Sequence, residues 1–341
     1  MLRKNNSIPL VLLIILAFLC GPAAFLGGLA ALWMNEGRVN WGEVAAVALP
    51  INAEQTEPAA ANEGKFVAVT GFAKIAEAYW VGDAPYLKPG AYLKLERVAE
   101  MYAWHEKKTY SGARNSTPTV TYSGEWTSTP PKWREFVEAQ THANPDPAIS
   151  AATFAPAQAE MGAYVFYPDR EMTFQTGVTL TLSPAIIGNG LSMMPDNAIY
   201  AGQGAAANPK IGDMRVKYRA VLPINRPVTV FGKQTSNAIE PYLHRGKSRL
   251  YRLVPGNRDE AIAALRQEYT TTLWGTRFFG VISTWFGLFF LLLPFSKLTN
   301  VFARVPLFKL IRHVSWVVVG VIALVLAFPL SLIVMLIANL F

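Results

Sequence analysis

Histidines and carboxylates are the side chains of this sequence that could do chemistry, and their spacing limits what they can do. His105 beside Glu106 offers a general base with an orienting carboxylate. Neighbouring residues of a strand point to opposite faces, so we expect His105 to be a surface or hydrogen-bonded residue instead. His142 lies in a turn sequence, and the sequence offers it no metal-ligand partners at helical or hairpin spacing, while His244 and His313 are isolated in the sequence. The sequence therefore predicts no metal site and no cofactor.

Sequence motifs for catalysis and nucleotide binding give no firm assignment either. The chain contains no HExxH, GxSxG, P-loop, EF-hand or protein-kinase motif. Gly202-Gln-Gly204 imitates a dinucleotide fingerprint, but no βαβ pattern surrounds it and Asn208-Pro209 follows at once, so we expect a flexible loop. One enzyme alternative stays open, because scattered carboxylates can meet in a cleft only in the fold. The candidates for such a cleft are Glu100, Glu106, Glu125 and Asp146.

Composition and charge indicate the class of protein that positions these residues. The chain has 341 residues, of which 52% are hydrophobic and only 16% charged, against about 25% in soluble domains. The net charge of +8 has an uneven origin, since all acidic residues lie between Glu36 and Glu268. Seven basic residues lie outside that range, namely Arg3, Lys4, Arg277, Lys297, Arg304, Lys309 and Arg312. They flank apolar runs, which indicates membrane topology and argues against nucleic-acid binding.

Three apolar runs are long enough to cross a membrane, which takes about 20 residues. The first, Ile8–Met34, has no charge and continues well past a signal-peptide core, so we interpret it as a retained span. The second is Leu273–Phe295. The third, Val314–Phe341, contains Pro329, and we favour one kinked span over a re-entrant hairpin. The single cysteine, Cys20, excludes a disulfide framework.

The basic flanks predict an orientation, because lysine and arginine near spans stay in the cytoplasm. Arg3 and Lys4 place the N-terminus there, and the connector Ser296–His313 carries four more cations. Three sections follow: the cytoplasmic N-terminus and first span (1–34), an extracytoplasmic region (35–272), and two further spans joined by a basic cytoplasmic loop (273–341). The extracytoplasmic region would face the periplasm in a bacterium and the lumen in a eukaryote.

The extracytoplasmic region has the pattern of a β-rich domain. Strands are predicted where valine, tyrosine, phenylalanine and threonine alternate or cluster between turn residues, at Lys65–Gly71, Tyr92–Trp104, Met214–Leu222 and Pro227–Gly232. The alanine-rich stretches Ala148–Ala159 and Ala198–Pro209 are predicted as short helices or loops. A helix is predicted over Asp259–Tyr269, because Asn257 and Glu260 form a capping box, and it should run into the second span as a stalk.

Two membrane features suggest contacts. Small residues recur every four positions on the first span, a spacing that allows helices to pack closely in lipid, either within the chain or between copies. These residues are Ala23, Ala24, Gly27, Gly28 and Ala31. The basic connector interleaves cations with apolar residues and could contact anionic lipid, although ordinary positive-inside flanking explains it too. Its cations are Lys297, Arg304, Lys309 and Arg312.

Several pieces of the chain, in order, resemble one family. They are Asn35-Glu36-Gly37-Arg38, Asn62–Val67, Leu93–Glu106 (LKLERVAEMYAWHE), Tyr122–Trp126 (YSGEW), His142-Ala-Asn144-Pro145, Ile211–Tyr218 (IGDMRVKY) and Trp274-Gly275-Thr276-Arg277. In these segments the chain resembles the transmembrane protein 43 (LUMA) family along nearly its whole length. Family members usually have four spans, so the resemblance leaves three or four spans open here, together with the side on which the chain ends.

The resemblance implies a multi-pass membrane protein with a large lumenal or periplasmic domain. Animal relatives look like scaffolds of the nuclear envelope and endoplasmic reticulum that self-associate and hold other membrane proteins. The family contributes no catalytic residues and no cofactor, and a bacterial relative would have no nuclear membrane to occupy.

The sequence thus predicts an α+β membrane protein, with transmembrane helices, a large, mainly antiparallel β extracytoplasmic domain and a helical stalk. We expect a scaffold that is not an enzyme, forms homo-oligomers, and binds membrane lipid and other membrane or envelope proteins. The expected location is the cell (inner) membrane of a bacterium, or the endoplasmic reticulum or inner nuclear membrane of a eukaryote. The alternative is an envelope enzyme or lipid-binding protein acting on lipid or cell-wall material.

Overall fold

A computed structural model describes residues 16–110, 117–175, 177–223, 225–293 and 315–340. The chain folds as two compact units. Met1–Glu43 and Ala263–Phe341 form the first, here called the helical unit, and Val44–Ile262 form the second, here called the β unit.

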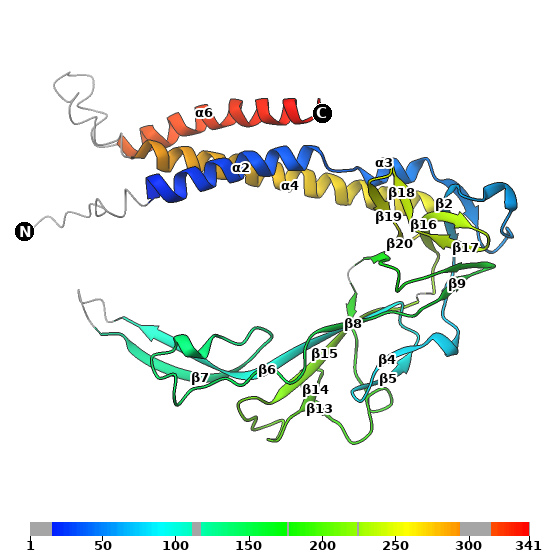
Figure 1. The fold of residues 1–341 in the computed structure, drawn as a ribbon, viewed down its shortest axis with the longest axis horizontal. Helices are drawn as coiled ribbons and strands as arrows, with labels where there is room; N and C mark the ends of the chain where they lie inside the picture. Colours follow the sequence, from blue (N-terminus) through cyan, green and yellow to red (C-terminus); the bar gives the residue numbers. More distant parts are fainter. Residues whose placement is uncertain (1–15, 111–116, 176, 224, 294–314, 341) are drawn as a thin grey trace, which may run out of the picture. The chain divides into compact units, whose positions relative to one another are not determined.

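Long apolar helices dominate the helical unit (Figure 1). The helices of the chain are a π-helical turn η1 (Leu16–Cys20), α2 (Gly21–Glu36), α3 (Trp41–Ala46), α4 (Arg258–Leu292) and α6 (Ser315–Ala338). Three helical stretches are long and apolar enough to cross a membrane: Phe18–Ala46, Arg258–Leu292 and Val317–Ala338. The described residues therefore contain three candidate spans, and each overlaps one of the predicted apolar runs. Residues 8–15 of the first run lie outside the described residues.

The start of α4 confirms the predicted capping box. The Asn257 side-chain oxygen accepts hydrogen bonds from the backbone N–H groups of Asp259 and Glu260, both at 3.1 Å. The Glu260 carboxylate in turn accepts the Asn257 N–H at 2.9 Å. These bonds satisfy donors that the first turn of a helix leaves without a partner. The helix then continues to Leu292, so the predicted stalk and the second span are one helix.

Helix α6 settles the choice between a kinked span and a hairpin. Pro329 lies inside the helix, which runs from Ser315 to Ala338 without reversing. One continuous span, the favoured prediction, is confirmed for these residues.

The β unit consists mainly of short strands, together with some of eight to sixteen residues. Its strands are β1 (Leu49–Asn52), β2 (Phe66–Gly71), β3 (Ala73–Lys74), β4 (Val81–Asp83), β5 (Leu87–Gly90), β6 (Lys94–Thr109), β7 (Thr119–Thr127), β8 (Ala152–Phe154), β9 (Ala159–Met161), β10 (Tyr164–Phe166), β11 (Thr173–Phe174), β12 (Val178–Thr179), β13 (Ser192–Met194), β14 (Ala198–Ala201), β15 (Met214–Val221), β16 (Val228–Thr235), β17 (Ala238–Glu240), β18 (Tyr242–His244), β19 (Ser248–Leu250) and β20 (Arg252–Pro255). Short 3-10 turns η2 (Ala60–Asn62), η3 (Glu77–Tyr79) and η4 (Trp133–Glu135) lie between them.

One large sheet has the order β1-β2-β16-β17-β10-β9-β3, with β20 also paired to β16 and β11 to β20. Two strands of similar sequence, β2 and β16, lie side by side in antiparallel register, with Val69 opposite Val230. The core against this sheet includes Tyr164 and Phe166, both fully buried. Both belong to β10, and burying one such side chain contributes about 1.5–3 kcal/mol, so β10 helps to anchor the sheet.

The second large sheet has the order β13-β14-β15-β6-β7, with β12 on β15 and β8 on β6. Along β6 the odd-numbered residues Leu95, Ala99 and Met101 are buried in its core. They lie opposite Ala220, Val216 and Met214 of β15, in that order, and these three residues belong to the same core. The period of two follows from the pleat of the strand, which turns successive side chains to opposite faces.

Two alanine-rich stretches correct the sequence-based expectation. Ala148–Ala159 contains β8, and Ala198–Pro209 begins with β14, so the short helices predicted as one alternative there are wrong. In β14 the backbone pairs with both β13 and β15, and Ile199 is fully buried. Packing against these neighbours overrides the helical propensity of alanine. Most pairings are antiparallel as expected, but β1–β2, β10–β17 and β11–β20 are parallel.

Strands β6 and β7 extend beyond the rest of their sheet as a long hairpin (Figure 1). β15 pairs with β6 only from Lys94 to Met101, whereas β7 pairs with β6 from Met101 to Thr109. The hairpin thus carries the MYAWHE end of the LKLERVAEMYAWHE segment, together with YSGEW, beyond the strands that pair with β15.

Candidate functional site

The hairpin β6–β7 presents one face to a covering segment, residues 128–147, which follows β7 in the chain. Even-numbered residues share this face, because Tyr102 is opposite Trp126, Trp104 opposite Gly124, and Glu106 opposite Tyr122. His105 is on the other face, as predicted. Its Nε2 atom is buried without a hydrogen-bond partner among the described residues, so the expectation of a satisfied or surface histidine holds only in part.

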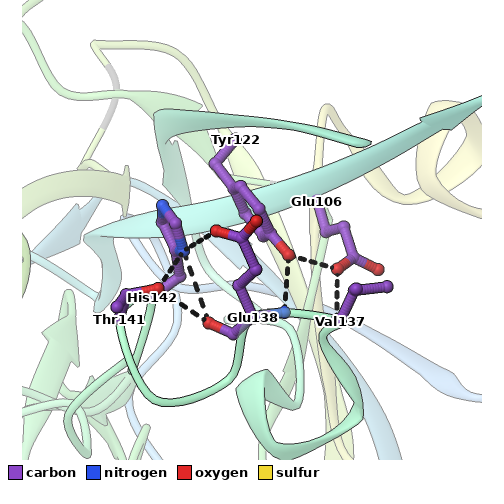
Figure 2. Close-up of polar contacts among 6 residues, drawn as sticks. All are labelled: Glu106, Tyr122, Val137, Glu138, Thr141 and His142. Carbon is purple, nitrogen blue, oxygen red and sulfur yellow. Dashed lines mark hydrogen bonds and ion pairs between the residues drawn. The ribbon is translucent and has the colours of Figure 1, made fainter. Parts of the chain in front are cut away.

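Glu106 and Tyr122 hold the covering segment against the hairpin (Figure 2). The Tyr122 hydroxyl donates to Glu106 Oε2 at 2.7 Å, and the backbone N–H of Val137 donates to the same oxygen at 2.6 Å. The Tyr122 oxygen also accepts the N–H of Glu138 at 2.9 Å. Two strand residues therefore satisfy two consecutive backbone donors of the segment.

The charge state of this pair is fixed by its neighbours. The hydrogen bond from Lys108 Nζ, 2.8 Å from Glu106 Oε1, together with the bonds from Tyr122 and Val137, lowers the pKa of Glu106 to about 2. Burial and the hydrogen bond to Glu106 raise the pKa of Tyr122 above its usual range. At neutral pH the carboxylate is an anion and the phenol is neutral. The pair is thus suited to fixing a surface, and poorly suited to donating or taking protons.

His142 completes the contact between segment and hairpin. Its ring stacks on Tyr122, with 3.6 Å between centroids and 10° between planes, and meets Trp104 edge-on at 4.8 Å. Its Nδ1 atom lies 3.0 Å from the Thr141 hydroxyl and 3.7 Å from a carboxylate oxygen of Glu138 (Figure 2). These contacts place the histidine as a packing residue between two aromatic rings.

Asn144 takes the place of a strand neighbour at the edge of β6. Its side-chain oxygen accepts the backbone N–H of Trp104 at 2.7 Å, and its amide donates to the carbonyl oxygens of Trp104 at 3.1 Å and Pro131 at 3.3 Å. The asparagine is 5% exposed. The segments AWHE, YSGEW and HANP thus meet in one site, although about 40 residues separate the first from the last.

A cavity of about 400 Å³ lies between two parts of the covering segment. It is lined by Pro130–Glu135 and by Asn144–Pro147, and Asp146 is the one residue of the four proposed catalytic carboxylates that borders it. Glu100 is instead bound to Arg215 at 2.6 Å, and Glu125 accepts the Ser123 hydroxyl at 2.8 Å. The convergence that the enzyme alternative required is not seen in the described part of the chain. Within the described part of the chain there is also no group of three or more histidine, cysteine, aspartate or glutamate residues that could hold a metal ion.

The loop around Gly202-Gln-Gly204, which imitates a dinucleotide fingerprint, binds a carboxylate of this chain. Asp213 accepts hydrogen bonds from the backbone N–H groups of Gln203 at 2.8 Å and Gly204 at 3.2 Å, and from the Tyr200 hydroxyl. A Cβ atom on Gly202 would lie 2.4 Å from this carboxylate. The glycines admit a carboxylate of the same chain, which fixes a loop that was expected to be flexible.

In the helical unit, the small-residue positions of α2 divide into two groups. A Cβ atom on Gly28 would lie 2.5 Å from Thr284 Oγ1 of α4, and the Ala24 carbonyl accepts a bond from Ser283 at 2.9 Å. These residues make the close approach within one chain. Gly27 has open space around it, Ala23 is exposed and Ala31 half-buried. The basic residues expected to contact lipid, Lys297, Arg304, Lys309 and Arg312, lie outside the described residues.

Two segments of the resemblance meet in a contact that the sequence reading missed. Arg277 of α4 binds both oxygens of Glu36 at the end of α2, at 2.8 and 2.6 Å, and Asn339 donates to the same carboxylate at 3.0 Å. The Glu36 side chain is only 1% exposed. A lone acid at the end of one apolar run and a lone arginine in another were the available signal, because a buried charge needs a partner.

The fold and these contacts define an integral membrane protein, with three candidate spans and a large β-rich region. The family described as Transmembrane protein 43 matches residues 101–341. The chain belongs to the transmembrane protein 43 family. It is 25% identical to the Transmembrane protein 43 homolog of Drosophila melanogaster over 310 residues, which cover 85% of this chain and 79% of that protein. No solved structure matches the chain significantly.

Proposed function

We propose that the protein is a multi-pass membrane scaffold that organises membrane protein complexes, with the β unit as its binding module. The observation that carries the proposal is the hairpin with its covering segment. Glu106, Tyr122, His142 and Asn144 bind one another and the backbone, so the groups that could do chemistry there fix a surface. A rigid surface of aromatic and polar groups suits protein recognition, because little flexibility is lost on binding.

The proposal includes an orientation. Basic residues flank the apolar runs at the N-terminus and in the connector, so the β unit lies outside the cytoplasm. The membrane is the inner membrane of a bacterium, or the endoplasmic reticulum or inner nuclear membrane of a eukaryote. A Cys20→Ser chain carrying Leu243→Cys, at a position 58% exposed, tests this with a membrane-impermeant maleimide. Labelling of intact cells or of lumen-accessible vesicles supports the orientation, and labelling only from the cytoplasmic side contradicts it.

Native mass spectrometry of the full-length protein, gently extracted from its own membrane, tests the scaffold. A reproducible oligomer or a stoichiometric partner protein is expected. Asn144→Ala, which releases the covering segment, should lower the bound fraction, whereas Leu243→Ala on an exposed strand elsewhere should not. A bare monomer without any protein partner contradicts the scaffold.

The alternative, a lipid-binding protein or an envelope enzyme acting on lipid or cell-wall material, is favoured by one observation. A groove of about 550 Å³ lies between α4 and α6, lined mainly by apolar residues that include Phe278, Val281 and Leu332, with Arg277 and Asn339 among its lining. An acyl chain would find an apolar surface there beside polar groups. A monomer that carries one specific lipid or saccharide in the native spectrum would favour this alternative.

A further inference from the structure

Strand β7 is a long edge strand whose outer side has no partner among the described residues. It is the last strand of its sheet, and no backbone hydrogen bond joins its outer edge to another described residue. The outward groups can be identified from β6. The N–H and carbonyl of Tyr102 bond to Asp213 and Gly212, away from β7. Two opposite residues of an antiparallel pair either bond to each other or both turn their backbone groups away from each other, so those of Tyr122, Gly124 and Trp126 face outward.

The outermost strands of the two large sheets are short or contain proline in the described part of the chain, except β7. At the far ends of the two large sheets, β13 has three residues, β3 has two, and β1 has four with Pro50 among them. β7 has nine residues, TVTYSGEWT, with no proline, no lysine and one charge, Glu125. Natural proteins protect edge strands by shortness, proline or charge, because an open edge is a template for another strand.

We infer that the outer edge of β7 pairs antiparallel with β7 of a second copy of this chain, which joins two sheets into one. The inference rests on the proposed function, of which it names one partner and its contact. The sequence of the strand favours one register, with Gly124 opposite Gly124 of the other copy. That register places Tyr122 opposite Trp126 and Ser123 opposite Glu125, twice each by symmetry.

Each of these pairs is favourable. Residues with outward backbone groups exchange two hydrogen bonds with the residue opposite, so three such pairs give about six bonds. The aromatic pair adds cross-strand contact. Ser123 and Glu125 are exposed and already bond to each other within one chain at 2.8 Å, so the same donor and acceptor can exchange between copies. A shift that placed Glu125 opposite Glu125 would bring like charges together, which disfavours that register.

The covering segment leaves this edge open. Its hydrogen bonds run to the Glu106 and Tyr122 side chains on one face and to the backbone of Trp104 on the far side of β6. Confinement of both copies to one membrane raises their effective concentration, so a contact of one strand with one strand suffices for association.

Disulfide trapping in the native membrane tests the register. In a Cys20→Ser background, which removes the one native cysteine, chains with Ser123→Cys are produced together with chains with Glu125→Cys. The two positions are opposite each other in a pair without backbone bonds, whose Cα atoms lie about 4.5 Å apart, close enough for a disulfide. Mild oxidation of the mixture should give a covalent dimer, and either chain produced alone should give much less. Equal yields in all three samples overturn the inferred register.

Charge exchange in the full-length chain provides the second test, at the same exposed positions. Ser123→Glu places two glutamates opposite each other in both symmetric pairs, and the dimer should dissociate about fivefold more readily. Ser123→Lys, the matched control, should retain or strengthen the dimer. The double variant Ser123→Glu with Glu125→Lys should restore it. Native mass spectrometry gives the dimer fraction in each case.

The possible results separate the inference from the proposal on which it rests. Loss with Ser123→Glu and recovery with the double variant support pairing of β7 edges. An oligomer that responds to none of these changes overturns the β7 contact and leaves the scaffold intact. A monomer bound to another protein does the same, whereas a monomer without partners contradicts both.

Discussion

Two carboxylates of this protein, Glu36 in the helical unit and Glu106 on the hairpin, are each held by a cation and by neutral donors, but in different surroundings. Glu36 is 1% exposed and binds Arg277 through both oxygens, between apolar helices. Glu106 is 7% exposed and binds Lys108, whose side chain is 38% exposed. A buried charge without its partner is costly, whereas a charge near water is screened. The contact of Glu36 with Arg277 therefore holds helices together, whereas Glu106 with Lys108 holds the covering segment at the protein surface.

Removing the cation from the buried pair should have the largest effect. Arg277→Leu leaves Glu36 without its counter-charge and should destabilise the helical unit by about 3–5 kcal/mol. The thermal midpoint of the protein in a mild detergent measures the loss. The double variant Glu36→Gln with Arg277→Leu should recover most of it, since no uncompensated charge remains. A single variant as stable as the wild type would show that the pair contributes little.

The close approach of α2 and α4 gives the next effect. Gly28→Val puts a side chain where a Cβ atom already lies 2.7 Å from the Gly280 carbonyl, and overpacking of this kind costs about 1–3 kcal/mol. Gly27→Val, one residue away in open space, is the matched control and should be nearly neutral within one chain. Comparable losses in both variants would mean that Gly27 also packs, in which case contact between copies becomes the explanation to test.

On the hairpin, Asn144→Ala should have a smaller and more local effect. Three hydrogen bonds are lost and the Trp104 N–H stays without its acceptor, which should cost about 1–2 kcal/mol. Hydrogen exchange should accelerate in residues 128–147 while the cores of the two sheets stay protected. Uniform acceleration through the β unit would contradict a local role.

The smallest effect is a pH dependence of the covering segment. The pKa of Glu106 is about 2 in the folded protein and near 4.5 when unfolded, so its contribution is complete above about pH 4.5 and is lost as the pH falls toward 2. Tyr122 has a raised pKa, so its contribution is complete below about pH 10 and is lost as the pH rises further. Tryptophan fluorescence across this range checks both limits. Glu106→Gln should remove the acid transition, and a transition that persists unchanged belongs to another group.

Much of the local structure could be predicted because it depends on neighbours in the chain. The capping box of Asn257 and Glu260 lies within one turn, and the alternation along β6 follows from the pleat. The alanine-rich stretch at Ala198 shows the limit, because its strand exists through pairing with β13 and β15. The candidate site shows the same limit. The sequence identifies His142 and Asn144 as part of a turn and of a family motif, but their contacts with β6 depend on tertiary folding.

The sequence by itself determined that this is a membrane protein of the transmembrane protein 43 family with a β-rich region, because long apolar runs, basic flanks and short motifs are properties of consecutive residues. Only the tertiary structure decided which charges neutralise each other, which glycines touch a neighbouring helix and which strand is left at the edge. Glu36 and Arg277 are 241 positions apart, and their meeting depends on how the helices pack. The open edge of β7 likewise follows from the order of strands in the sheet, which alternation along a single strand does not contain.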